Sequence, residues 1–349
     1  NSQRALEARK HTVELILSNH CGDCLSCIRN QNCELQKLAQ QLGIRKVRYE
    51  GEKTPPTFDE VAPGIVRDTS KCVLCGRCIE TCKKVQGLGI LSFINRGFNT
   101  KVAPVFDKSF NDVNCMQCGQ CVNACPVGAL RERDDTDKVW DALSDPEKFV
   151  VVQPAPAVRV ALGEEFGLPI GTRVTGKMTQ ALRRLGFDKV FDTDFGADLT
   201  IMEEATELLG RIQSGGVLPM FTSCSPGWVK YLEHHFPEMI PNMSTCKSPM
   251  QMLSALIVEQ QKDCEKKHFN IAVMPCTGKK FEAARSEFTH DGKPDVDAVI
   301  TTQELIHMIR TAGIEFDTVV PEAIDAPFGM FSGAGVIFGA TGGVTEAVL

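Results

Sequence analysis

Apolar runs alternate with amphipathic stretches in the C-terminal part of the chain, from Phe149 onward. The runs typical of buried strands are 149–152, 190–191, 217–221, 271–274 and 298–300. The stretches with helical spacing are 177–185, 199–212 and 303–311, and glycine closes each of them. This alternation predicts an α/β domain with a mostly parallel sheet. Ligands bind at the carboxyl ends of such strands, where we expect Cys224 and Cys276 to lie.

The first 146 residues lack this alternation. Residues 4–46 predict a helix followed by a cysteine-rich turn, and a linker rich in charge and proline follows at 51–63. Residues 66–133 contain few long apolar runs. We therefore expect something other than a large apolar core to hold this part together.

Composition narrows the class of protein. The 349 residues are 43% hydrophobic and 23% charged, as in ordinary soluble globular proteins. A net charge of −6 without a long basic run disfavours a nucleic-acid partner. No apolar run is long enough for a membrane segment, and the chain starts without an apolar signal sequence. The 16 cysteines are clustered rather than spread, which indicates metal binding in a reducing compartment, so we expect a cytoplasmic protein.

Eight cysteines form two quartets with the spacing C-x₂-C-x₂-C-x₃-C. They are Cys72, Cys75, Cys78 and Cys82, then Cys115, Cys118, Cys121 and Cys125. In two-cluster ferredoxins this spacing holds two electron-relaying [4Fe–4S] clusters, each with three cysteines of one quartet and the fourth of the other. We expect one cluster on 72, 75, 78 and 125, and the other on 115, 118, 121 and 82. Zinc also binds C-x₂-C pairs, but it needs two pairs rather than two triplets with a trailing fourth.

A further ligand set precedes the quartets. His20, Cys24, Cys27 and Cys33 offer one imidazole and three thiolates. On spacing alone a Cys₃His zinc site competes with an iron–sulfur cluster, and Cys21 is an alternative fourth ligand. The position directly before two cubanes favours a third [4Fe–4S] cluster, whose histidine ligand would raise its potential.

Two motifs of the C-terminal part carry a family resemblance: TSCSPGW at 222–228 and MPCTGKKFE at 274–282. With them the chain resembles the [FeFe]-hydrogenases over nearly its whole length, in the order His/Cys₃ unit, two-cluster ferredoxin unit, α/β domain. The resemblance implies an active site in which a [4Fe–4S] cubane is bridged to a two-iron unit that carries CO, cyanide and an azadithiolate. It also favours His20 over Cys21.

The resemblance assigns roles to single residues around that cofactor. Cys276 would be a ligand of the cubane, Lys279 would hydrogen-bond a cyanide, and Met274 would pack beside the two-iron unit. Pro156 and Ala157 would line the pocket with backbone groups, although several relatives have Ser where this chain has Ala157.

A proton path is implied by the same resemblance. It would run through Glu207, Ser244, Glu204 and Cys224, with Arg211 near its outer end. Glu204, Glu207 and Arg211 share one stripe of a predicted helix. Without the resemblance, the simpler interpretation of that stripe is a solvated face with an i,i+4 ion pair. Cys246 and Cys264 match no ligand position and are most simply packed or surface thiols.

The sequence departs from the family pattern at two places. Ser225 stands where the family has a second cubane cysteine, and a serine hydroxyl deprotonates much less readily than a thiol. Ser225 would then ligate weakly, or the cubane would be perturbed or incomplete, or Cys224 would take over as ligand. The chain also stops at Leu349 before the third active-site motif, so we expect an incomplete active-site domain.

The expected fold is therefore multidomain, α+β and α/β. The predicted domains are a His/Cys₃ module at 1–62, a two-[4Fe–4S] ferredoxin-like domain at 63–146 and a hydrogenase active-site domain at 147–349. The expected activity is the reversible reduction of protons to H₂, in a multi-subunit complex with a flavoprotein that oxidises NAD(P)H, with ferredoxin, or with both. Maturation proteins would insert the two-iron unit. The alternative is a non-catalytic electron-transfer, sensor or assembly protein on the same fold.

Overall fold

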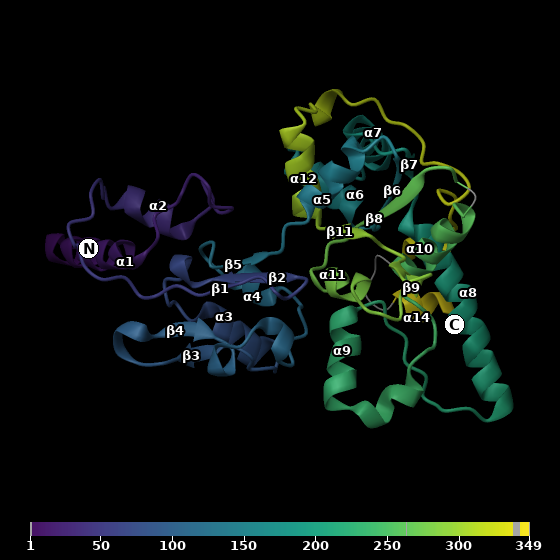
Figure 1. The fold of residues 1–349 in the computed structure, drawn as a ribbon, viewed down its shortest axis with the longest axis horizontal. Coiled ribbons are helices and arrows are strands. Elements are labelled where there is room, and N and C mark those ends of the chain that lie inside the picture. The colour runs from purple at the N-terminus through teal and green to yellow at the C-terminus, as the bar shows by residue number, and fades with distance from the viewer. Residues whose placement is uncertain (1, 263, 338–342, 349) are drawn as a thin grey trace. The chain divides into compact units, whose positions relative to one another are not determined.

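The structure is a computed structural model that describes residues 2–262, 264–337 and 343–348 (Figure 1). The chain divides into two compact units, Asn1–Arg133 and Asp134–Leu349. The three-domain division with boundaries at 62 and 146 stays a prediction beside this result. None of the described helices is long and apolar enough to cross a membrane.

The first unit is built from short elements. Its helices are α1 (Gln3–Asn19), α2 (Glu34–Gln41), α3 (Arg77–Glu80) and α4 (Gln120–Ala124). Its strands are β1 (Phe58–Asp59), β2 (Ile65–Asp68), β3 (Ser92–Ile94), β4 (Lys101–Ala103) and β5 (Leu130–Glu132). β1, β2 and β5 form an antiparallel three-stranded sheet, and β3 pairs with β4 in an antiparallel hairpin.

Cysteines make up a large share of this unit's core. Five thiols are buried among apolar side chains such as Ile65, Phe110 and Leu130; they are Cys33, Cys78, Cys115, Cys121 and Cys125. None of the 16 cysteines, all of which lie in the described part of the chain, forms a disulfide. The unit is therefore organised around thiols that are available to bind metal.

The second unit is an α/β domain. Its helices are α5 (Thr136–Ser144), α6 (Val158–Glu165), α7 (Thr175–Leu185), α8 (Thr193–Ser214), α9 (Pro226–His235), α10 (Pro249–Gln260), α11 (Gly278–Ala283), α12 (Thr302–Thr311), α13 (Gly333–Ile337) and α14 (Gly343–Val348). Its strands are β6 (Lys148–Pro154), β7 (Lys189–Val190), β8 (Lys267–Val273), β9 (Thr289–His290), β10 (Lys293–Pro294) and β11 (Ala298–Ile300).

The central sheet has the order β11-β8-β6-β7, and all its neighbouring strands are parallel. Alternate residues of β6 enter different cores: Val150 and Val152 pack with helices α5, α6, α7 and α12, whereas Val151 packs with α10. The sheet is thus covered on both faces, as in most parallel sheets. This explains why its strands are nearly continuous apolar runs in the sequence.

Most elements predicted from the apolar pattern are confirmed, with one correction. The three predicted helices correspond to α7, α8 and α12, and Gly186 and Gly215 close two of them in the left-handed conformation. The strand predicted at 217–221 is wrong, because only Phe221 makes an isolated bridge, to Met243. Pro219 lies inside that run, and proline cannot donate a ladder hydrogen bond. Cys224 therefore does not follow a strand, whereas Cys276 does, directly after β8.

Candidate functional site

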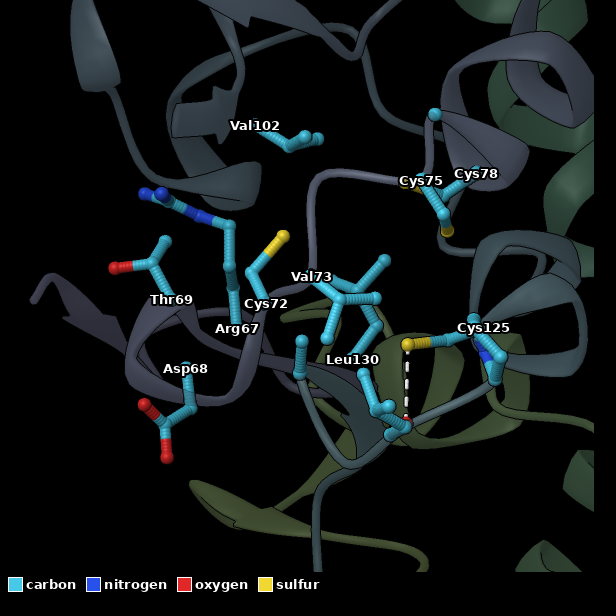
Figure 2. Close-up of a pocket in the computed structure, with 14 residues that line it drawn as sticks. Arg67, Asp68, Thr69, Cys72, Val73, Cys75, Cys78, Val102, Cys125 and Leu130 are labelled. Carbon is cyan, nitrogen blue, oxygen red and sulfur yellow. Dashed lines mark hydrogen bonds between the residues drawn. The ribbon is translucent and has the colours of Figure 1, made fainter. Parts of the chain in front are cut away.

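The first unit holds a pocket lined by thiols from both quartets. Cys72, Cys75, Cys78 and Cys125 surround it, together with apolar residues that include Val102 and Leu130 (Figure 2). Its space, with the open mouth included, is about 430 Å³. The structure thus brings three cysteines of the first quartet together with the last cysteine of the second, which is the crossed grouping that the spacing predicts.

The pKa values of the thiols reflect the same grouping. Burial raises the pKa of Cys72 to about 11, and the nearby Cys125 and Cys75 add to the rise. Burial likewise raises the pKa of Cys78 to about 12, with Cys72, Cys125 and Cys75 as neighbours. Each thiolate would stand in an apolar environment beside other thiolates, which is unfavourable until a cation neutralises them.

The other four quartet cysteines lie near one another as well. Burial holds the pKa of Cys121 well above its usual range, and the thiols that raise it further are Cys115, Cys118, Cys78 and Cys82. Two sets of four soft sulfur donors, half of them buried, suit iron–sulfur clusters. Among residues 2–262, 264–337 and 343–348, no three His, Cys, Asp or Glu side chains are grouped as a site for a single metal ion.

The predicted N-terminal ligands lie in the turn after α1. His20 Nδ1 accepts a hydrogen bond from Gly22 N at 3.1 Å, and Cys21 Sγ lies 3.9 Å from the same atom. Burial lowers the pKa of His20, and Lys53 and Lys71 lower it further, so the imidazole is held in the neutral form that binds metals.

Two of the three thiols of this set, Cys27 and Cys33, lie close to the segment that follows the second quartet. Cys33 is buried, and Glu34 N donates to Pro126 O at 3.1 Å. A Cβ added at Gly128 would lie 2.8 Å from Cys27 Sγ, which is too close for a side chain. This contact explains why the residue at 128 is glycine. The N-terminal set therefore packs against the segment that follows Cys125.

The second unit holds a different kind of pocket, of about 730 Å³ with its open mouth. Its polar lining includes Glu204 from α8, Cys224 before α9, and Ser244 and Cys246 from the segment before α10. Glu282 from α11 lies on it too. Three residues of the predicted proton path therefore meet at one cavity.

Glu207 is the centre of a hydrogen-bond network beside this pocket. Its Oε1 accepts from Arg211 Nη2 at 2.5 Å, and its Oε2 accepts from Ser244 Oγ at 2.8 Å and from Thr245 N at 2.9 Å. Although burial acts to raise it, the pKa of Glu207 lies below its usual value because Ser244, Thr245 and Arg211 stabilise the carboxylate. Cys246 Sγ lies 3.8 Å from Oε2. Glu207 is thus an ionised carboxylate that these hydrogen bonds keep in place.

Glu204 lies one turn earlier on the same helix, and its pKa is shifted in the opposite direction. Its side chain is buried, and its Oε2 has no hydrogen-bond partner in the described part of the chain. Burial raises the pKa of Glu204 to about 7, and the negative charge of Glu207 adds to the rise. A carboxyl group that titrates near neutral pH and faces a pocket is suited to carry protons.

This environment predicts a stability effect at Glu204. The raised pKa means that the carboxyl's ionisation lowers stability by nothing below its ordinary pKa of 4.5, and that this loss grows with pH until about 7. Glu204→Gln should therefore raise the free energy of unfolding by up to about 3 kcal/mol near pH 8, at about 1.4 kcal/mol per pKa unit. It should leave stability unchanged near pH 4. Urea unfolding at both pH values checks this, and an equal gain at both would contradict it.

The MPCTGKKFE motif occupies the loop after β8 and helix α11. Met274 is buried and its N donates to Ile300 O at 2.9 Å. Lys279 Nζ donates to Glu282 Oε2 at 2.5 Å, and Ser248 donates to Oε1 of the same carboxylate. The chain itself therefore supplies a partner for Lys279, whereas the family resemblance implies that Lys279 hydrogen-bonds a cyanide.

Two further predicted residues lie at helix starts. Ser225 is the N-cap of α9, but its side chain makes no capping hydrogen bond, and its neighbour Cys224 is exposed. Ala157 is the N-cap of α6, directly after Pro156. The loop of Pro156 follows β6, and Ala155 N donates to Val273 O at 2.9 Å, so it runs beside the loop of Cys276.

Sequence analysis missed several residues of this site. Thr245, Cys246, Ser248 and Glu282 all line the pocket, and Cys246 was interpreted as a packed or surface thiol without a role. The available signal was proximity in sequence: Cys246 lies two residues after Ser244, and its N donates to Ser244 Oγ at 3.1 Å.

Thiol sets in the first unit and a carboxyl–thiol pocket beside a parallel sheet in the second are features of an iron–sulfur oxidoreductase. Residues 148–349 match the family described as iron only hydrogenase large subunit, C-terminal domain. Residues 9–48 match the NADH-ubiquinone oxidoreductase-G iron-sulfur binding region, and residues 62–131 match the ferredoxin-like domain of NADH-quinone oxidoreductase subunit 3. The chain belongs to the iron-only hydrogenase large-subunit family, and it carries iron–sulfur binding domains before the hydrogenase domain.

Individual relatives agree with this assignment. The whole chain is 49% identical to the NADP-reducing hydrogenase subunit HndD of Solidesulfovibrio fructosivorans and 44% identical to iron hydrogenase 1 of Clostridium pasteurianum. It spans 61% and 62% of the length of these two proteins. A solved structure of the [FeFe]-hydrogenase HydA1 from Chlamydomonas reinhardtii matches 62% of this chain and 56% of its own, with 43% identity and a TM-score of 0.54.

Proposed function

We propose that the protein containing this chain catalyses the reversible reaction 2H⁺ + 2e⁻ ⇌ H₂. The observation that carries the proposal is Glu204, a buried carboxyl that titrates near neutral pH and shares a pocket with Cys224 and Ser244. Electron relay alone needs no proton-carrying group, so this carboxyl favours the enzyme over a non-catalytic protein. The chain spans less than two thirds of the length of the two relatives named above, so the activity is proposed for the whole protein.

The cofactors in this proposal are three [4Fe–4S] clusters and an active-site cubane joined to a two-iron CO/cyanide unit. The N-terminal cluster is held by His20, Cys24, Cys27 and Cys33, and the next two by the crossed quartets. Cys276 is the cubane ligand that this chain provides, with Ser225 at a second ligand position and Met274, Lys279, Pro156 and Ala157 around the two-iron unit. When bound, the active-site group supplies the electrons and the metal that polarises H₂.

The chain's own residues move the protons. Arg211 holds the Glu207 carboxylate near the outside, where it can receive a proton only briefly because its pKa is low. The Ser244 hydroxyl donates to Glu207 and borders the pocket, so it can accept a proton on one side and release one on the other. Glu204 and then the thiol of Cys224 carry the proton onward across the pocket.

The partners belong to the proposal as well. We assign electron exchange to a flavoprotein subunit that oxidises NAD(P)H, to ferredoxin, or to both, and insertion of the two-iron unit to maturation proteins. The NADP-reducing relative and the matches to NADH-quinone oxidoreductase regions support the flavoprotein. The clustering of 16 cysteines that form no disulfide supports a reducing, cytoplasmic setting.

The activity is tested directly with the full-length gene product, produced without oxygen together with maturation proteins. H₂ evolution is measured by gas chromatography with reduced methyl viologen as donor. The proposal predicts H₂ formation that depends on the maturation proteins. An iron-loaded protein that forms no H₂ under these conditions would favour the non-catalytic alternative.

The crossed grouping of the quartets predicts how double variants lose iron. Cys125→Ala and Cys72→Ala each remove one cluster, and the pair together should remove no more, because both cysteines border the same pocket. Cys125→Ala with Cys115→Ala should remove two clusters. Iron content and electron paramagnetic resonance measure the loss, with Cys264→Ser, at an exposed thiol, as the control. The reverse pattern would show uncrossed ligation.

A further inference from the structure

Arg159, in the first turn of α6, is a buried cation that joins two parts of the second unit. Its Nε donates to Pro156 O at 3.1 Å, and its Nη2 donates to Asp192 Oδ1 at 2.7 Å. Its Nη1 lies 3.4 Å from Asp194 Oδ2. One guanidinium therefore reaches a backbone carbonyl and two carboxylates.

The first part that it reaches is the loop of Pro156 at the carboxyl end of β6. β6 pairs in parallel with β8, with Pro154 opposite Val273. Both strands therefore deliver their loops to the same edge of the sheet, one with Pro156 and the other with Cys276. In parallel sheets this edge is where ligands bind.

The second part that it reaches is the start of α8, the helix that carries Glu204 and Glu207. Asp192 is the N-cap of α8, and its Oδ1 accepts from Asp194 N at 3.0 Å as well as from Arg159. Asp192 is fully buried. The same carboxylate oxygen therefore fixes the helix start and holds the guanidinium.

We propose that Arg159, held by Asp192, is a positioning residue that locks the Pro156 loop to the start of α8 and so fixes the cofactor pocket against the proton-carrying helix. The inference rests on the proposed function, because that function makes the Pro156 loop part of the pocket. Only the planar fork of arginine presents several donors in fixed directions, and a lysine at this position would keep the charge but reach fewer acceptors.

The burial of this group argues for a specific role beyond stability. Asp192 Oδ2 and Asp194 Oδ1 are buried without a hydrogen-bond partner in the described part of the chain. A buried guanidinium whose carboxylate partners lack some hydrogen bonds is a costly way to stabilise a fold. Apolar residues of similar size often stabilise a fold equally well. What the charged group adds is a fixed direction for the Pro156 carbonyl.

The first experiment uses the full-length protein before maturation and measures backbone hydrogen exchange in Arg159→Lys. We expect exchange in residues 155–158 and at the start of α8 to accelerate by about tenfold or more. Without the guanidinium contacts, local opening of these segments should become more favourable by that factor. Arg310→Lys, at an exposed arginine that pairs with Glu165, is the matched control and should leave both segments unchanged. Unchanged exchange in Arg159→Lys would overturn the inference.

The second experiment records infrared spectra of the matured proteins in the CO and cyanide stretching region. Arg159→Lys should shift the cyanide bands relative to the parent protein, and Arg310→Lys should not. Parent bands that Arg159→Lys leaves in place would overturn the inference and leave the proposed function standing. A parent protein without bands would overturn both. If Arg159→Lys does not fold, Asp192→Ala, which removes the acceptor of Arg159 Nη2, takes its place, and the same results support or overturn the inference.

Discussion

Glu204→Gln is expected to lower H₂ evolution by the full-length matured protein by about 10²–10⁴-fold, the usual contribution of a positioned proton-transfer group. Glutamine keeps the size of the side chain but cannot take up or release a proton. Because the pKa of Glu204 is raised to about 7, the native carboxyl can do both at neutral pH. The same substitution should stabilise the fold above neutral pH, so lost activity cannot be attributed to unfolding.

The matched control is Glu203→Gln, one residue earlier on α8. Glu203 is exposed, so its charge is screened by water and the substitution should leave H₂ evolution unchanged. Rates are compared with reduced methyl viologen as donor, at equal iron content. If Glu204→Gln evolves H₂ as fast as the parent, protons do not pass through Glu204.

Lys280→Met is expected to have the largest effect on stability. The Lys280 side chain is 2% exposed, and its Nζ lies 2.9 Å from Asp135 Oδ2 and 2.8 Å from Glu304 Oε1. It also donates to Val299 O at 2.8 Å. Methionine would leave the buried Glu304 carboxylate without its cation and Asp135 with the exposed Lys138 alone, which costs about 3–5 kcal/mol. The group ties α11, α12, β11 and the start of α5 together, so the whole second unit should unfold more easily.

The control is Lys138→Met, which removes a lysine that pairs with the same Asp135. The Lys138 side chain is 54% exposed, and exposed ion pairs contribute about 0–1 kcal/mol. Urea unfolding followed by circular dichroism compares the two variants. Equal small losses in both would mean that the buried lysine is not essential to the fold.

Much of the fold could be predicted from the sequence, because the spacing of apolar residues reflects which side chains of a strand or helix are buried. The centre of β6, at 149–152, is an apolar run because helices cover both faces of its sheet. Glycine marks the ends of α7 and α8 and follows α12. The run at 217–221 has the same apolar character but contains Pro219, and it does not join the sheet. Apolar content alone did not distinguish a strand from a loop.

The site was predictable where spacing alone determines geometry. The crossed grouping of Cys125 with the first quartet follows from eight positions in the sequence, and these thiols meet around one pocket. The surroundings of Glu207 were not predictable, since Ser244 and Thr245 reach it from 37 and 38 residues away. The raised pKa of Glu204 has the same origin, because burial by distant segments leaves no local sequence signal.

The measurement that tests the central claim most directly is an anaerobic infrared spectrum of the full-length gene product made with maturation proteins. Carbonyl and cyanide bound to iron absorb in a region where protein does not. The account predicts bands in that region and would then require that Ser225 is tolerated at its ligand position. A spectrum without such bands, from protein whose iron count shows the other clusters in place, would contradict it and leave an electron-relay or sensory role.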